Sequence, residues 1–129
     1  MRFMMLLKAT QDSEAGGLGN PELAAATAKM AEEASRRGQL IDAGGLMPSS
    51  AGARIQVTKG KTSVIDGPFA ETKELIGGFA IFELGSKEEA VQMATEFMRV
   101  HADILGPAYE GVLEVRPMFG TPPHVPKRN

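Results

Sequence analysis

The sequence predicts an α+β fold in which two helices cover one face of a single antiparallel sheet. Two stretches have the apolar spacing of helices, one beginning after Asn20 and one at Ser86. A third stretch, residues 53–66, alternates in polarity around Lys59-Gly60 as the arms of a hairpin do. Strand-like apolar runs flank the two helices at 2–9, 39–48, 78–84 and 112–119. The order β-α-β, hairpin, β-α-β is that of a split βαβ, ferredoxin-like arrangement.

Both predicted helices carry their own start signals. Asn20 can cap the first helix, Pro21 suits its first turn, and Gly38 lies just beyond its end. Ser86 precedes Glu89 by three residues, which is a capping-box pattern for the second helix. The expected buried stripes are Leu23, Ala26, Met30 and Ala34 in the first helix, and Val91, Ala94, Met98 and His101 in the second.

Glycine and proline mark the expected interruptions. Residues 10–20 are polar and rich in glycine, and they are predicted to form a loop. The strand at 39–48 is expected to bulge, or to meet another backbone closely, at Gly44-Gly45. Residues 121–129 are Pro-rich and basic, and we expect them to be a mobile tail, or one laid across a neighbour, outside a domain of residues 1–120.

Composition excludes several function classes. With 129 residues the chain has the length of one domain, and its net charge of -2 without a basic stripe argues against nucleic acid as a partner. The absence of cysteine removes disulfides, thiolate nucleophiles and Cys-ligated metals, and fits a reducing compartment. The first apolar run stops at Lys8, and no run reaches the length of a membrane span. A cytoplasmic protein is therefore expected.

Two of the predicted strands are apolar on both faces. In the first strand Met5 points one way and Met4 the other, and in the strand at 78–84 Phe79 and Ala80 divide in the same manner. Strands of this kind are buried on both faces, whereas two helices cover only one. We therefore expect a homodimer that packs sheet against sheet. The alternative is that the hairpin or the tail folds across the open face.

The stretch DGPFAETKELIGGF, residues 66–79, is first interpreted as a turn. Asp66 can accept hydrogen bonds from the amides that follow it, Gly67 tolerates unusual backbone angles, and Pro68 fixes one of them. Phe69 is expected to insert into the core. These residues explain a rigid connection between two strands without any ligand.

The three charged residues that follow the turn suggest a second interpretation. Glu71, Lys73 and Glu74 lie close together, and such groups can set one another's protonation and act as acid, base or substrate anchor. The alternative is a short helical turn at residues 70–76 that leaves Glu71 and Glu74 exposed.

Glu114 and Arg116 are two residues apart in the last strand and so share one face. Arg116 can bind a ligand carboxylate through two hydrogen bonds. Its alternatives are a surface ion pair, or a bond to Asp66 or Glu71 that anchors the turn; of these interpretations we favour the anchoring bond.

His101 is the one histidine before the tail, and it continues an apolar helical stripe. It is expected either to bond the carbonyls at the helix end or to act as a general base, since its ordinary pKa lies near neutrality. His101 and His124 have no metal-ligand spacing, and the carboxylates form no recognisable cation loop. No glycine loop matches a phosphate-binding fingerprint, so neither a metal nor a cofactor is expected.

Several segments together resemble one family. The motif DGPFAETKE with GGF after it, the start MRFMMLLKA and the late EVRP are similar to the YCII-related family, in its DGPF branch, from about Met1 to Phe119. The resemblance implies a dimeric α+β barrel with a pocket between the sheet and adjoining loops. It further implies relatives that are small lyases or dehalogenases of aromatic compounds, and others encoded beside or fused to alternative sigma factors.

The enzyme-like branch of that family has a histidine in its first helix and an Asp-Pro pair after its second, proposed as a catalytic couple. The corresponding segments here read PELAAATAKMAEEASRRG and GPAYEG, so that couple is not carried over. We expect a protein that binds a small polar or anionic ligand near the DGPF turn. Its alternatives are a small lyase or hydrolase, and a non-catalytic interaction module for a transcription factor. Ligand contacts are expected from Asp66, Glu74, Glu114 and Arg116, and acid–base roles from Glu71, Lys73 and His101.

Overall fold

The computed structural model describes residues 1–17 and 19–120, and the predicted tail at 121–129 lies outside them. No helix within the described residues is long and apolar enough to cross a membrane. The elements in chain order are β1 (Arg2–Lys8), α1 (Gln11–Glu14), α2 (Pro21–Arg36), β2 (Leu40–Gly45), η1 (Ser49–Ala51), β3 (Ala53–Thr58), β4 (Lys61–Asp66), η2 (Thr72–Glu74), β5 (Ile76–Glu83), α3 (Lys87–Leu105) and β6 (Leu113–Pro117).

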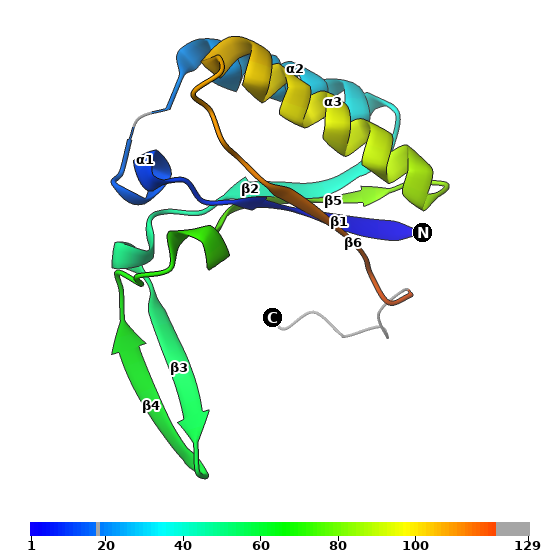
Figure 1. Cartoon of the computed structure of the whole chain (residues 1–129). Helices are drawn as coiled ribbons and strands as arrows, with labels where there is room; N and C mark the ends of the chain where they lie inside the picture. Colours follow the sequence, from blue (N-terminus) through cyan, green and yellow to red (C-terminus); the bar gives the residue numbers. More distant parts are fainter. Residues whose placement is uncertain (18, 121–129) are drawn as a thin grey trace, which may run out of the picture.

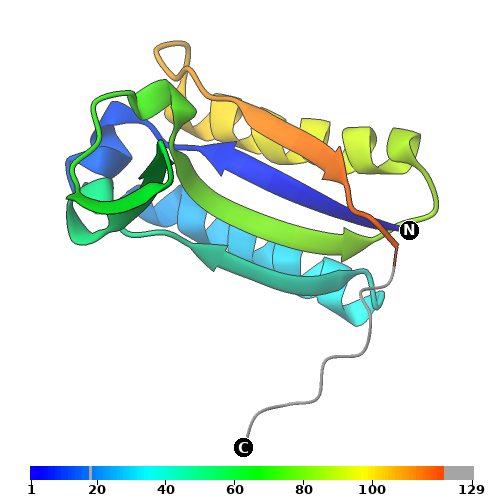
Figure 2. The ribbon, with the colours of Figure 1, turned by 90° about the horizontal axis from the view of Figure 1, so that it is seen from below.

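The main sheet has four strands in the order β2-β5-β1-β6, and every neighbouring pair is antiparallel. Helices α2 and α3 lie together over one face of it (Figure 1). Figure 2, turned to view the molecule from below, shows the opposite face without a helix in front of it. The predicted ferredoxin-like α+β fold is therefore confirmed.

The core lies between the sheet and the two long helices. Large side chains come from the strands, where Phe3 is fully buried, and small ones come from the helices. The buried apolar residues are Phe3, Met5, Phe82 and Leu84 on the strands and Ala34, Ala90 and Ala94 on the helices. Met4, Leu6, Phe79 and Ile81 alternate with the strand members of this core. They occupy the other side, which we call the open face.

Both predicted N-caps are present, although Glu89 accepts from the amide of Gly85 and not from that of Ser86, so the predicted capping box is not reciprocal. The side chain of Asn20 accepts a hydrogen bond from the amide of Leu23 at 3.0 Å. The hydroxyl of Ser86 accepts one from the amide of Glu89 at 3.2 Å. The stripe predicted for α3 is wrong at Val91, which is 45% exposed beside a groove between α3 and β6. The helix is rotated so that the neighbouring Ala90, and not Val91, faces the sheet.

Two short segments differ from the sequence prediction. Helix α1 lies within the stretch predicted to be a loop, because Thr10 and Ser13 form a reciprocal cap there. Strand β5 begins at Ile76, two residues before the predicted start at residue 78, so Gly77 is inside the strand as well as Gly78. The irregularity predicted at Gly44-Gly45 lies earlier in β2, where the register shifts between Leu40 and Asp42. At Gly44 the close neighbour is a side chain and not a backbone, since a β-carbon there would lie 3.0 Å from the ring of Phe79.

The β3–β4 hairpin projects from the sheet on the side opposite the helices (Figure 1). Its turn is at Lys59-Gly60 as predicted, with φ angles of 52° and 77° that suit a tight hairpin turn. Every residue of both strands is exposed. The hairpin therefore does not fold across the open face of its own chain, and the same alternative for the tail falls outside the described residues.

We expect Phe3→Ala to lower the free energy of unfolding by about 3–5 kcal/mol, because it removes a large, fully buried side chain from the core. Urea unfolding followed by circular dichroism measures the change. Phe119→Ala is the matched control, since that ring is fully exposed and its loss should cost less than about 0.5 kcal/mol. Equal losses in the two variants would contradict the described core.

Candidate functional site

The DGPF segment, Asp66 to Phe69, forms the root of the hairpin and contacts the turn at residues 49–52. The amide of Gly67 donates to the carbonyl of Gly52 at 3.0 Å. The amide of Phe69 donates to the hydroxyl of Ser49 at 3.0 Å. A β-carbon at Gly67 would overlap the carbonyl oxygen of Ser49, so only glycine fits there.

Glu14 anchors this contact from the helix that sequence analysis missed. Its carboxylate accepts a hydrogen bond from the Ser49 amide at 2.7 Å and another from the Ser49 hydroxyl. The same hydroxyl accepts the Phe69 amide, so Ser49 links α1 to the DGPF segment. The hydroxyl and amide of Ser49 hold the pKa of the Glu14 carboxyl below its ordinary value.

Phe69 packs against the hairpin. The guanidinium of Arg54, from β3, lies 3.9 Å from the centre of the Phe69 ring. Phe69 is half-buried and is not a member of the core cluster. The prediction that it inserts into the core is therefore wrong, because the hairpin root holds it on the side of the sheet away from the helices.

The predicted polar residues after the turn are exposed. Residues Thr72–Glu74 form the short 3-10 helix η2, and Glu71 and Glu74 face solvent, as the turn interpretation predicted. Asp66 and Lys73 are also exposed. The ion pairs within residues 1–17 and 19–120 involve none of these four side chains. Their ligand-binding and acid–base roles stay predictions.

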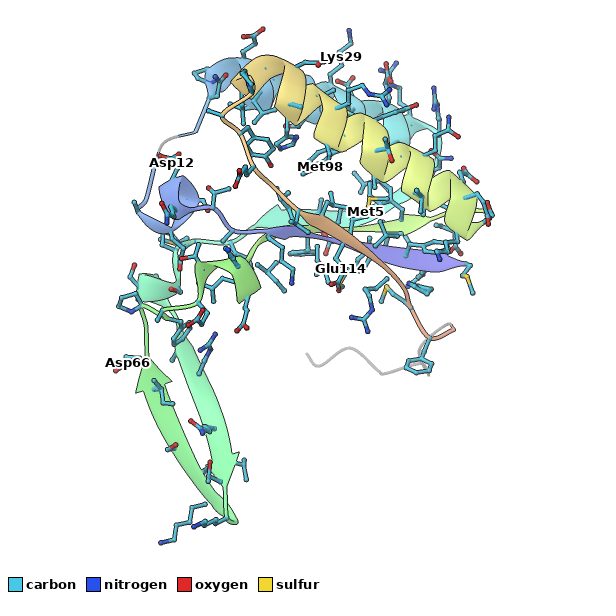
Figure 3. The ribbon with its side chains drawn as sticks, in the orientation of Figure 1. Met5, Asp12, Lys29, Asp66, Met98 and Glu114 are labelled. Carbon is cyan, nitrogen blue, oxygen red and sulfur yellow. The ribbon has the colours of Figure 1, made fainter. Side chains whose placement is uncertain are left out.

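Glu114 and Arg116 pair with each other on β6, at 3.1 Å between Oε2 and Nη1. The predicted anchoring bond from Arg116 to Asp66 or Glu71 is therefore wrong, and the surface ion pair is the arrangement present. Figure 3 shows why: Glu114 lies beneath the sheet, whereas Asp66 lies at the root of the hairpin. The side chains of Glu114 and Arg116 are 40% and 68% exposed, so solvent screens the pair.

His101 is buried on α3, with 6% of its surface exposed. Its Nδ1 lies 2.9 Å from the carbonyl oxygen of Phe97. Because a carbonyl only accepts, Nδ1 carries the proton and donates. Since α3 continues to Leu105, this carbonyl is inside the helix and not at its end, which corrects the prediction. The rings of Phe97 and Tyr109 stand 4.6 and 5.7 Å away, and burial raises the pKa of the Tyr109 hydroxyl.

The predicted site residues therefore do not converge. His101 belongs to the helical layer, Glu114 and Arg116 to the open face, and the others to the hairpin root and η2. In the part of the chain that the structure describes, no three His, Asp or Glu side chains are grouped closely enough to hold a metal ion.

A cavity of about 570 Å³ lies between the helices and the sheet, and we call it the helix–sheet cavity. Figure 2 shows α2 behind β2 and β5, which are the elements that supply most of its walls. Small residues leave this space open: Ala24, Ala28 and Ala31 on α2, and Gly45 on β2, where a β-carbon would meet nothing within 4 Å. Larger apolar side chains, including Met5, Leu7, Phe82, Met93 and Phe97, complete it.

The model of the YCII-related domain matches residues 1–117. The chain belongs to the YCII-related family. An uncharacterized protein of Rhizobium meliloti (strain 1021) is 36% identical over 81 residues, which cover 63% of this chain and 60% of that protein. Membership of this family is consistent with the observed α+β fold, and neither comparison names an activity.

Sequence reasoning missed the helix–sheet cavity, although the sequence contains a signal for it. The segment ELAAATA places three small residues on the inner face of α2, and glycine pairs occur in both β2 and β5. Only the tertiary structure, by packing α2 over the paired strands β2 and β5, brings these segments together around the cavity.

Ser49→Ala should raise the pKa of Glu14 toward its ordinary value, because it removes the hydroxyl that donates to the carboxylate. A lowered pKa stabilises the folded state above the ordinary pKa, and that contribution is lost as pH falls through the lowered value. The variant should therefore lose less stability than the native protein on acidification. Carboxyl NMR titration measures the pKa of Glu14, and amide exchange at Phe69 at several pH values measures the stability of the contact that Ser49 makes.

Ser50→Ala is the matched control, since Ser50 is the exposed neighbour in the same turn. It should leave both the Glu14 titration and the Phe69 amide unchanged. An unaltered Glu14 pKa in Ser49→Ala would show that the hydroxyl does not hold the DGPF segment to α1.

Proposed function

We propose that the protein binds a small, largely apolar molecule in the helix–sheet cavity. The observation that carries this proposal is the size and lining of the cavity. Its volume of about 570 Å³ falls within the range of about 300–1,000 Å³ that is typical of small-molecule sites. Most of the lining is apolar, as in such sites, with few polar groups.

Packing physics supports a ligand in this space. Protein interiors fill to a density of about 0.74, and unfilled volume destabilises the fold because the lining loses dispersion contacts. Here the alanines of α2 and Gly45 of β2 stand where larger apolar residues would narrow the gap. A bound apolar molecule restores those dispersion contacts. The unfilled space therefore lowers the stability of the free protein but favours binding of a ligand.

The edge of the cavity supports the same conclusion. Glu33 on α2, Arg37 just after α2 and Glu96 on α3 are among its lining residues, and all three are exposed. Charged groups at the solvent side and apolar groups inside suit a ligand that enters from water and leaves its apolar part buried.

The polar or anionic ligand predicted near the DGPF segment stays a second proposal. Its support is that Ser49 and Gly52 fix the segment, so Glu71, Lys73 and Glu74 are presented from a rigid turn. The lyase or hydrolase alternative, which would use Glu71, Lys73 or His101, stays a prediction as well. A transcription-factor partner also stays a prediction.

We also propose a homodimer that buries the open face. Met4, Leu6, Phe79 and Ile81 form its half-buried apolar centre, and charged residues of both signs border it. The border residues are Arg2, Asp42, Glu83, Glu114 and Arg116. An apolar centre inside a polar rim is the usual composition of a protein interface, and mixed charges can complement themselves across a two-fold axis.

The hairpin adds to this proposal. Ile55, Val57 and Val64 share one of its faces and are 66%, 67% and 68% exposed. An isolated two-stranded hairpin is only marginally stable in water, so this stripe favours a partner that covers it. Because the hairpin projects on the side of the open face (Figure 1), a second copy of the chain is positioned to cover both surfaces at once.

Ala31→Leu should weaken the binding of 1-naphthol at least about tenfold, because the added side chain fills part of the helix–sheet cavity. Isothermal titration calorimetry measures the affinity, with circular dichroism to check the fold. Ala25→Leu is the matched control: it makes the same change on α2 at an exposed residue outside the lining, and should bind normally.

Glu71→Gln separates the two ligand proposals in the same assay. It should leave 1-naphthol binding unchanged, because Glu71 is exposed and is not part of the cavity lining. Loss of binding in Glu71→Gln, with none in Ala31→Leu, would place the ligand at the DGPF segment and reject the cavity.

Sedimentation of the native chain at micromolar concentration should show a dimer, and Ile81→Asp should show a monomer that keeps its helical signal. The substitution places a charge in the apolar centre of the open face, where dimerisation would have to bury it. Val112→Asp is the control at an exposed residue before β6, and it should remain dimeric. A native chain that sediments as a monomer contradicts the dimer.

A further inference from the structure

The helix–sheet cavity extends across the main sheet. Its lining runs from Ala43 and Gly45 on the edge strand β2, through β5 and β1, to Leu113 on the opposite edge strand β6. Neighbouring strands lie about 4.8 Å apart, so four strands span about 14 Å. Of the described lining residues on these strands, Ala43 and Gly45 are the exposed ones. The cavity is therefore open at β2, and Leu113 lies at its inner end.

The side chain of Leu113 closes that inner end. Leu113 pairs with Leu7 of β1, which also lines the cavity. It is half-buried and packs against the core cluster. Because successive side chains of a strand alternate, Glu114 points to the open face and Leu113 points toward the helices. Leu113 is therefore the side chain that β6 contributes to the wall.

A second hollow lies beyond Leu113. It is the groove between α3 and β6, which we call the α3–β6 groove. Its lining residues are Val91, Ala94, Thr95, Met98, Arg99 and Ala102 on α3 and Leu113 and Val115 on β6.

Helix α3 stands between the groove and the cavity. It supplies the cavity with a different set of side chains, Met93, Glu96 and Phe97. Figure 2 shows this helix, in yellow, behind the orange β6. Among the residues that the structure describes, Leu113 alone lines both hollows. Leu113 is thus the partition between them.

A wall at this position limits how long a bound molecule can be. Each further CH2 group that is buried in an apolar site strengthens binding about fourfold, as long as there is room for it. A chain that has reached a packed side chain gains no more, because extra atoms in filled space displace their neighbours. Truncation of a packed leucine reopens space, because the surrounding structure relaxes only in part.

We propose that Leu113 sets the maximum length of the ligand that the helix–sheet cavity accepts, by closing its inner end and separating it from the α3–β6 groove. This inference rests on the proposed binding function. It narrows that function to apolar molecules that are no longer than the cavity is wide across the sheet, about 14 Å.

Straight-chain alcohols from 1-pentanol to 1-dodecanol test the length limit. Calorimetry on the native chain should show the affinity rising about fourfold for each added CH2 group, and then no further rise once the alcohol reaches Leu113. Leu113→Ala should move this limit to a longer alcohol, because it removes the isopropyl end of the partition. Val115→Ala is the matched control, since Val115 lines the groove but not the cavity, and it should keep the native limit.

Two methionine methyl groups report where the alcohol lies. Met93 lines the cavity and Met98 lines the α3–β6 groove. In the native chain the bound alcohols should shift the NMR signal of the Met93 methyl and leave that of Met98 in place. In Leu113→Ala the longest alcohols should shift both. If Leu113→Ala does not fold, Leu113→Val makes a smaller opening, and the Met98 signal of the native chain still tests the partition.

The outcomes separate the role of Leu113 from the function on which it rests. An affinity that rises across the whole native series, an unchanged limit in Leu113→Ala, or a Met98 shift in the native chain overturns the partition and leaves the cavity function standing. A longer limit in Val115→Ala also overturns it, and assigns the wall to Val115. No response of Met93 to any of the alcohols contradicts the proposed function itself.

Discussion

The two central strands, β1 and β5, are apolar on both faces, and the rest of the structure depends on how those faces are covered. Helices α2 and α3 cover one of them, and Phe3 becomes fully buried there. The other face keeps Met4 and Ile81 half-buried, because neither the helices nor the hairpin of the same chain reaches it. One apolar face of the sheet is therefore covered by the helices of the same chain, and the proposed dimer would cover the other.

On the covered side, the division of sizes between the layers produces the cavity. The strands contribute Phe and Met, whereas α2 presents a row of alanines to them. Small residues permit the helix and sheet to approach where large side chains lie opposite, as at Phe82. Where the alanines of α2 and Gly45 of β2 line the cavity, neither layer fills the space. One pattern of residue sizes therefore explains both the core and the candidate site.

The DGPF motif has a structural explanation in this molecule. Gly67 and Phe69 bond to the turn at residues 49–52, and Glu14 fixes that turn through Ser49. Together they attach the hairpin to the domain at one point. These contacts name no reaction, because the residues needed to hold a connection differ from those needed to transform a substrate.

The sequence by itself determined the element order, the helix caps and the two-faced strands, because each depends on neighbours within a few residues. Asn20 and Ser86 cap helices wherever those helices lie. The sequence did not determine the pairing of Arg116 with Glu114, the position of Phe69 or the helix–sheet cavity. Those depend on residues distant in the chain, and only the tertiary structure, by placing β2 beside β5 and α2 above them, decided which groups meet.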